Sequence, residues 1–225
     1  MRESNHVENA LQELYTMLGE ILGEIRKEAE PVPASTNLKT FFGEVRHSLF
    51  GGRLTAAQVS GMEAKLRAFE QAGFPLSWAA YAMATSYHET AKRMQPVREG
   101  LSASDKWRKK NLRYYPWYGR GDVQLTWEEN YAKADKELGL NGRLINDLDL
   151  ALDPDISAKI MTRGMKEGWF SRGHSLPKYF PNNEASREQF KNARRIINIM
   201  DKADLIAGYA VKFQEALKKA GYKGS

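Results

Sequence analysis

Residues 75–100 read PLSWAAYAMATSYHETAKRMQPVREG and carry the pattern that decides the fold. Pro75 favours a helix start, because proline fits the first helical turn, where its missing N–H is not needed. The residues that follow are mostly small, apolar or aromatic, and helical spacing places Trp78 and Glu89 on one face. The segment therefore predicts a largely buried helix that ends at Glu89, with a second acid, Glu99, ten positions further on.

Two acids in such different settings suit the hydrolysis of a glycosidic bond. One acid must protonate the leaving oxygen, and a second group must activate water or stabilise the sugar cation. The proton donor has to stay protonated near neutral pH, which an apolar setting favours. Glu89 ends an aromatic-rich helix, whereas Glu99 follows Arg98, whose charge favours a carboxylate. The chain has 28 acidic residues, so many other pairs could be chosen. The spacing of Glu89 and Glu99 by itself therefore gives only a hypothesis of catalysis.

Residues 114–131, YYPWYGRGDVQLTWEENY, add a substrate class to this hypothesis. Tyrosines and tryptophans surround two glycines, and Gln124, Thr126 and Asn130 provide uncharged hydrogen-bonding groups. Sugar rings have apolar faces and polar edges, so this mixture suits carbohydrate binding. The alternative is an aromatic core beneath a loop, to which Trp127 would contribute.

Other chemistries find no support in the sequence. His88-Glu89 resembles the start of a zinc-binding H-E-x-x-H helix, but Lys92 occupies the position of the second histidine. No G-x-S-x-G pattern marks a serine nucleophile, and there is no cysteine for a disulfide or a thiolate metal site. Residues 120–122, RGD, match a cell-adhesion tripeptide, which we attribute to chance. We expect no metal, no cofactor and no nucleic-acid partner.

Composition and periodicity predict the domain organisation. The chain has 225 residues, a hydrophobic fraction of 42% and a formal net charge of +6, which suits a globular domain with anionic partners. Apolar residues at heptad spacing between positions 7 and 25 predict an amphipathic helix over residues 1–30, which either self-associates or docks on its own domain. Residues 31–37, with two prolines, predict a linker, and residues 38–225 the catalytic domain.

Helical patterns dominate after the linker, and no alternation of strand and helix indicates a parallel sheet. Thr55 and Gln58 form the pattern of a capping box, and Asp153 followed by Pro154 predicts another helix start. Residues 100–130 predict a polar loop with a short hairpin. Residues 187–200 and 203–221 predict two closing helices.

Several short motifs follow one another in a fixed order: His88-Glu89-Thr90, Val97-Arg98-Glu99, Tyr118-Gly119-Arg120-Gly121, Gln124-Leu125-Thr126, Asn130-Tyr131 and Ile196-Ile197-Asn198. Together they resemble the family 19 glycoside hydrolases, the chitinase-type enzymes that include bacteriophage endolysins. The resemblance spans roughly residues 38–220. It implies a mainly α, two-lobed, lysozyme-like fold and hydrolysis with inversion.

The resemblance also implies roles for individual residues. Glu89 would be the general acid and Glu99 the general base, and Thr126 would help to hold the attacking water. Other motif positions would contact substrate: Tyr118, Gln124, Asn130 and Asn198. Arg195, just before the Ile-Ile-Asn motif, is a further candidate for steadying the acidic cleft.

Departures from the plant-type chitinases concern the substrate. Only ten positions separate the two acids, there are no cysteines, and Ile199 and Met200 replace the usual glycines. This compact form resembles the bacteriophage and prophage members, for which the implied substrate is peptidoglycan; chitin remains open. The alternatives are a lytic transglycosylase, which needs one acid, and a non-catalytic sugar-binding or virion structural module.

Location is inferred from the same resemblance and from the ends of the chain. The first residues contain acids where a secretion signal would have a basic start and an apolar run. We therefore expect synthesis in the cytoplasm of a bacterial host without a signal peptide, and action at the cell wall. Residues 105–113, DKWRKKNLR, include five basic residues, which form either a solvated loop or a contact with the anionic envelope.

Overall fold

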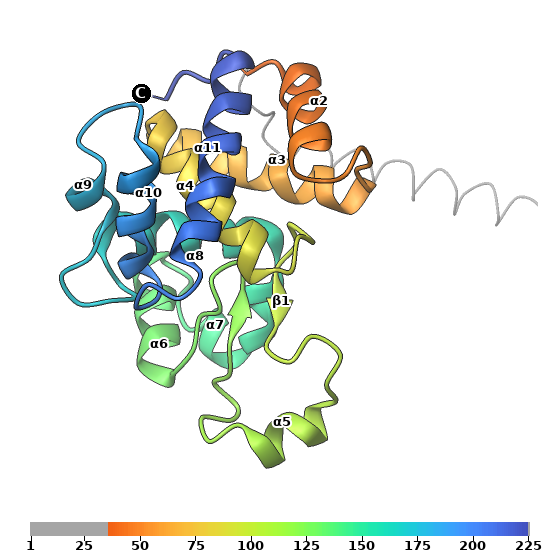
Figure 1. Ribbon diagram of the computed structural model, residues 1–225. Helices are drawn as coiled ribbons and strands as arrows, with labels where there is room; N and C mark the ends of the chain where they lie inside the picture. The colour runs from red at the N-terminus through yellow and green to blue at the C-terminus, as the bar shows by residue number, and fades with distance from the viewer. Residues whose placement is uncertain (1–35, 225) are drawn as a thin grey trace, which may run out of the picture. The chain divides into compact units, whose positions relative to one another are not determined.

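The computed structural model describes residues 36–224 (Figure 1). The expected amphipathic helix over residues 1–30, its self-association through residues 7–25 and most of the linker at 31–37 lie outside the described residues.

Within the described part the chain is mainly helical, and the predicted fold class is confirmed there. The α-helices are α2 (Leu38–Ser48), α3 (Ala56–Gln71), α4 (Leu76–Glu89), α5 (Asp105–Asn111), α6 (Glu128–Glu137), α7 (Arg143–Asn146), α8 (Pro154–Glu167), α9 (Leu176–Tyr179), α10 (Arg187–Ala193) and α11 (Ala203–Lys219). Two 3-10 turns are η1 (Leu148–Leu152) and η2 (Arg194–Ile196). None of these helices is both long and apolar enough to cross a membrane.

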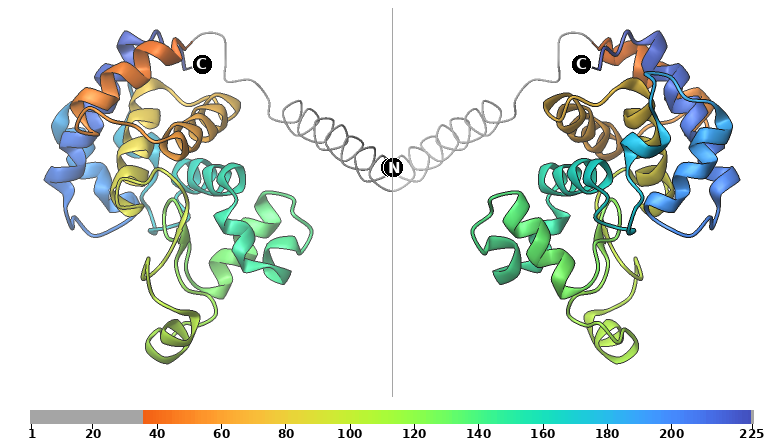
Figure 2. Two further views of the ribbon diagram at one scale, coloured as in Figure 1. Left: turned by 90° about the vertical axis from the view of Figure 1, so that its right-hand side faces the viewer. Right: turned by 90° about the vertical axis from the view of Figure 1, so that its left-hand side faces the viewer.

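Helix α4 is the centre of the fold. It packs mainly against α11 and also contacts α3 and α8, so that almost all of its side chains are buried (Figures 1 and 2). Pro75 precedes it and offers no side-chain cap, and the loop at Asn183 supplies the missing acceptors. The side chain of Asn183 accepts from the Leu76 N–H and its carbonyl from the Ser77 N–H, both at 2.8 Å. The helix is thus fixed at its start by a distant loop.

The two predicted helix starts are confirmed. At α3, the Thr55 hydroxyl accepts from the Gln58 N–H, and the Gln58 side chain accepts from the Thr55 N–H. At α8, the Asp153 carboxylate accepts from the N–H groups of Asp155 and Ile156. At both positions the local sequence is enough to predict where the helix starts.

The polar region at 100–130 differs from its prediction in two ways. Strand β2 (Arg120–Gly121) pairs antiparallel with β1 (Val97–Arg98), which lies before the region expected to contain the whole hairpin. Part of the supposed basic loop is helix α5, capped by Ser104. Arg108 of this helix turns inward, is 5% exposed, and ties the helix to the backbone carbonyl groups of Glu99 and Gly100.

The helix expected over residues 187–200 is shorter than predicted. Helix α10 ends at Ala193, and the chain tightens into η2. The Arg194 guanidinium donates to the carbonyl of Asp201 at 2.9 Å, which draws the following loop back over the turn. A contact seven residues along the chain therefore overrides the local helical pattern.

Candidate active site

Glu89 is the last residue of α4 and forms an ion pair with a buried arginine. Its Oε1 lies 2.9 Å from Nη1 of Arg194, and the two side chains are 19% and 2% exposed. Neither of these two atoms makes a hydrogen bond within residues 36–224, so the contact is a charge interaction alone. Buried polar atoms are nearly always hydrogen-bonded, so this pair is an exception within the described part of the protein.

This arrangement corrects two expectations about Glu89. Its surroundings are not apolar alone, since Arg194 supplies a positive charge. The arginine that steadies the acid is Arg194 and not Arg195, whose side chain bonds Asn192 at 2.9 Å. In a 3-10 turn successive side chains point about a third of a turn apart, so only one of the two arginines can face Glu89.

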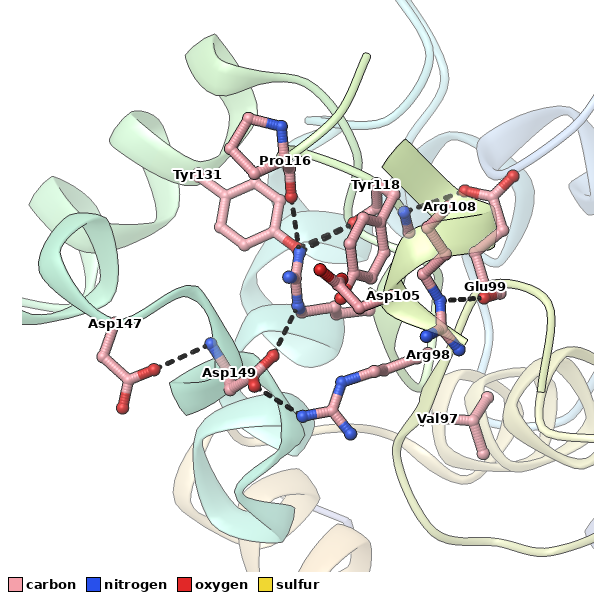
Figure 3. Close-up of polar contacts among 12 residues, drawn as sticks. Val97, Arg98, Glu99, Asp105, Arg108, Pro116, Tyr118, Tyr131, Asp147 and Asp149 are labelled. Atoms are coloured by element: carbon pink, nitrogen blue, oxygen red, sulfur yellow. Dashed lines mark hydrogen bonds and ion pairs between the residues drawn. The ribbon is translucent and has the colours of Figure 1, made fainter. Parts of the chain in front are cut away.

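Glu99 follows β1 and is held by hydrogen bonds at both carboxylate oxygens. Tyr114 donates its hydroxyl to Oε1 at 2.6 Å, and the Gly119 N–H donates to Oε2 at 2.9 Å. The Glu99 N–H donates to the Gly119 carbonyl at 2.7 Å, and Arg108 donates to the Glu99 carbonyl at 2.8 Å (Figure 3). Both the backbone and the carboxylate of Glu99 are therefore fixed.

Arg98 does not assist Glu99 as the sequence suggested. Successive residues of a strand point to opposite faces, and Arg98 turns away to pair with Asp149 at 2.5 Å (Figure 3). Burial acts to raise the pKa of Asp149, but hydrogen bonds from Arg98 and Arg120 outweigh it and lower that pKa. The hydrogen-bond donors to Glu99 come from Tyr114 and Gly119 instead.

Tyr114 remains a hydrogen-bond donor over a wide pH range. Burial, followed by its hydrogen bond to Glu99, raises the pKa of Tyr114 to about 12. Its phenol therefore stays protonated near neutral pH and continues to donate to the carboxylate.

The backbone of Gly119 lies close to two side chains, those of Gln124 and Glu99. A Cβ added there would lie 2.7 Å from Oε1 of Gln124 and 3.2 Å from Oε2 of Glu99. The close approach lets the Gly119 amide reach the carboxylate.

Gln124, Thr126 and Asn130 form one chain of contacts beside Glu99. Gln124 donates its side-chain amide to the Val97 carbonyl at 3.1 Å, which ties the loop to β1. The Thr126 hydroxyl donates to the Gln124 carbonyl, and the Asn130 amide to the Thr126 carbonyl, both at 2.8 Å. The hydroxyl oxygen of Thr126 keeps lone pairs that can accept from a water molecule.

Tyr118 has a different setting from the other motif residues. It is 3% exposed, and the Arg120 guanidinium lies 3.7 Å from its ring centroid. Tyr118 lines a hollow of about 580 Å³ together with Arg98, Arg108 and Asp149. With one face covered by Arg120, the ring does not offer the open platform that sugar stacking needs.

The contacts thus form two groups. One contains Glu89 and Arg194, together with the backbone of exposed Asn198, whose N–H donates to the Arg194 carbonyl at 2.9 Å. The other contains Glu99 and the Gln124 loop. No group of three or more acidic, histidine or cysteine side chains suited to a metal occurs within residues 36–224.

Three contributors were not assigned roles from the sequence: Tyr114, Arg108 and Arg194. Tyr114 stood out only as one aromatic among several, and Arg108 only as one charge of a basic segment. From the sequence, Arg195 and not Arg194 is expected as the arginine beside the candidate acids. No sequence signal separates two adjacent arginines, because their directions depend on where the helix ends.

Two comparisons with known proteins found similarity to chitinases. A stretch of 44 residues, 19% of the chain, is 48% identical to the acidic 26 kDa endochitinase of Solanum lycopersicum, and it spans 17% of that relative's length. The solved structure of a chitinase C mutant aligns with a TM-score of 0.50 at 18% sequence identity, covering 86% of this chain and 97% of that one. No protein-family model matches the chain.

Similarity at such low identity shows the fold, and the architecture implied by the sequence motifs is confirmed. By a short stretch of sequence and by its fold, the chain is similar to the chitinase-type glycoside hydrolases.

Proposed function

We propose that the protein is an endolysin-like glycoside hydrolase that cleaves β-1,4 bonds of peptidoglycan and thereby lyses bacterial cell walls. The observation that carries the proposal is the contrast between two carboxylates on a chitinase-type fold. Within residues 36–224, Glu89 has a buried oxygen that is ion-paired with Arg194 and makes no hydrogen bond, whereas hydrogen bonds occupy both oxygens of Glu99. Pairs of acids in unequal environments are typical of acid–base catalysis.

The proposed reaction assigns one step to each acid. Glu89 gives its proton to the glycosidic oxygen as the bond to the anomeric carbon breaks. Water attacks that carbon from the opposite face and passes its proton to Glu99, and the Thr126 hydroxyl accepts a hydrogen bond from the water. The product has the inverted configuration. Arg194 orients Glu89, and Tyr114 with the Gly119 amide keeps Glu99 aimed at the water.

Charge supports peptidoglycan over a neutral polymer. Helix α5 carries the exposed residues Lys106, Lys109 and Lys110 and lies at the far end of the molecule from α2 and α11 (Figures 1 and 2). Peptidoglycan peptides and the surrounding envelope are anionic, so this helix would attract them. The cell wall is the place of action under this proposal, with residues 38–225 as the catalytic domain.

Product analysis on purified peptidoglycan and chitin, side by side, tests the proposal. We expect new reducing ends from peptidoglycan, with the inverted anomer detected first by NMR. Glu89→Gln should abolish this activity while the fold remains intact by circular dichroism. Retention of more than about a tenth of the activity would contradict the role of Glu89, since general acids contribute at least about a hundredfold.

The same products decide against the alternatives. Fragments lighter by one water would identify a lytic transglycosylase. Binding to the polymer without new reducing ends would indicate a sugar-binding or virion module. Light scattering before and after removal of residues 1–30 tests self-association, because an unchanged monomer mass would contradict it.

A further inference from the structure

A fully buried ion pair lies outside the two groups of candidate site residues. Nζ of Lys65 in α3 lies 2.7 Å from Oδ1 of Asp122, and both side chains are 0% exposed. The hydroxyl groups of Ser86 and Ser157 each donate to this carboxylate at 2.7 Å. The Asp122 N–H donates to the Ser157 hydroxyl at 2.9 Å. The pair thus joins α3, α4, α8 and the turn after β2.

Asp122 connects the chain segments that carry the two acids. Ser86 is one turn before Glu89 on α4, so its hydrogen bond holds the end of that helix. Asp122 is three residues after Gly119, whose amide holds Glu99. Asp122 therefore belongs to the loop that holds Glu99, and its carboxylate contacts the helix that carries Glu89.

Lys65 holds the segment between the acids. It donates to the Met94 carbonyl at 2.9 Å and to the Gly61 carbonyl at 3.2 Å. A Cβ at Gly61 would lie 1.9 Å from the Met94 carbonyl oxygen, so glycine permits this approach. Ala91, Lys92 and Met94 have positive φ angles, which non-glycine residues rarely adopt. Surrounding contacts must maintain such a backbone, and Lys65 provides one of them.

We infer that the buried Lys65–Asp122 pair is a positioning device that fixes Glu89 and Glu99 relative to each other. The inference rests on the proposed function of these two acids. Desolvation offsets much of the attraction within a buried ion pair, so stability alone is a weak reason for such a pair. Its contacts with all three segments that place the acids give it a geometric role. A displacement of about 1 Å can lower turnover by about a hundredfold.

Three variants separate positioning from stability. Ser86→Ala removes a single hydrogen bond from the helix of Glu89. Lys65→Met/Asp122→Leu replaces the pair with apolar groups, which often preserves or increases stability. Phe41→Ala is the control, because it creates a cavity in α2, which carries no candidate site residue.

Turnover and substrate affinity should respond differently. Well below every melting temperature, we expect kcat to fall about fivefold in Ser86→Ala and about fifty-fold in the double variant, with KM within about twofold. Phe41→Ala should melt earlier but keep the kcat of the wild-type protein. Wild-type kcat in the double variant, or losses in all three variants that follow melting temperature, would overturn the inference.

A measurement without substrate separates this inference from the proposed function. Hydrogen exchange should accelerate selectively at the amides of Met94, Glu99 and Gly119 in the double variant, and uniformly in Phe41→Ala. A wild-type protein that hydrolyses neither polymer would contradict the proposed function only. Unchanged exchange at these three amides would overturn the positioning role, whatever the substrate is.

Discussion

The two candidate acids occupy contrasting regions of one fold. Glu89 ends a long buried helix, and Oε1 of its carboxylate forms an ion pair with Arg194 without a hydrogen bond within residues 36–224. Glu99 follows a strand of two residues, and Tyr114 and Gly119 hold its carboxylate by hydrogen bonds. The core of the protein places the first acid, whereas a local set of donors places the second.

The two residues thus differ both in how the backbone is held and in what contacts the carboxylate. A rigid helix fixes the backbone of Glu89, and Oε1 of its carboxylate is buried against Arg194. At Glu99 the donors hold the carboxylate as an acceptor, which is the form that receives a proton from water. If the contrast is functional, changes at the two regions should differ in kind and in size.

The largest effect is expected from removing either carboxylate. Glu89→Gln and Glu99→Gln should each lower kcat by about 10²–10⁴-fold with little change in KM, because each removes one proton transfer. Reducing-end assays at saturating substrate measure the loss. The control is Glu215→Gln, at an exposed position of α11, which should retain full activity. Equal activity in Glu99→Gln and this control would remove Glu99 from the reaction.

The next largest effect concerns the two adjacent arginines. Arg194→Met should lower the free energy of unfolding by about 3 kcal/mol, because Glu89 is then mostly buried without a counter-charge. Arg195→Met should change it by less than about 0.5 kcal/mol, since the hydrogen bonds that Arg195 makes within residues 36–224 go to nearby Asn192. Urea denaturation of both variants measures the difference. Similar losses of unfolding free energy in the two variants would contradict the different roles of Arg194 and Arg195.

These arginines mark the limit of prediction from sequence. The helix starts at Thr55 and Asp153 were predictable, because each signal lies within four residues of the helix it starts. The burial of the helix before Glu89 followed from its composition. The direction of Arg194 did not, because it depends on a turn that contacts Asp201, beyond the end of the helix.

The surroundings of Glu99 were harder to predict for a similar reason. Arg98 precedes it in sequence, and only the pairing of Val97–Arg98 with Arg120–Gly121 turns that side chain to the opposite face. Tyr114 lies fifteen residues away along the chain, and no local pattern connects it to Glu99. Motif resemblance singles out Glu99 as a candidate, and only the tertiary fold shows which groups hold its carboxylate.

A smaller effect is expected from the donor to Glu99. Tyr114→Phe removes one hydrogen bond to a charged group, so kcat should fall about tenfold, equivalent to about 1.4 kcal/mol. Tyr115→Phe is the matched control, because that hydroxyl bonds Asp105 and not a candidate acid. Initial rates for the two variants test the assignment. A loss confined to Tyr115→Phe would place the functional phenol elsewhere.

The smallest effect concerns pH and His88, next to Glu89. Burial is the largest influence on the pKa of His88 and lowers it from the ordinary value of 6.5, although the charge of Glu89 acts in the opposite direction. The unfolded chain therefore binds a proton more readily than the folded one, and stability should decrease as pH falls through and below about 6.5. Above that range both states are neutral at this residue, and no effect is expected.

Because the His88 side chain is only partly buried, the decrease should be modest. Urea midpoints at about pH 7.5 and about pH 5.5 should differ more for the wild-type protein than for His88→Gln, which cannot titrate. His174→Gln, at a histidine on the loop before α9, serves as the comparison for the loss of a histidine elsewhere in the fold. If His88→Gln kept the wild-type difference, the acid sensitivity would arise at other groups, and the buried end of α4 would tolerate a charged imidazole beside the Glu89–Arg194 pair.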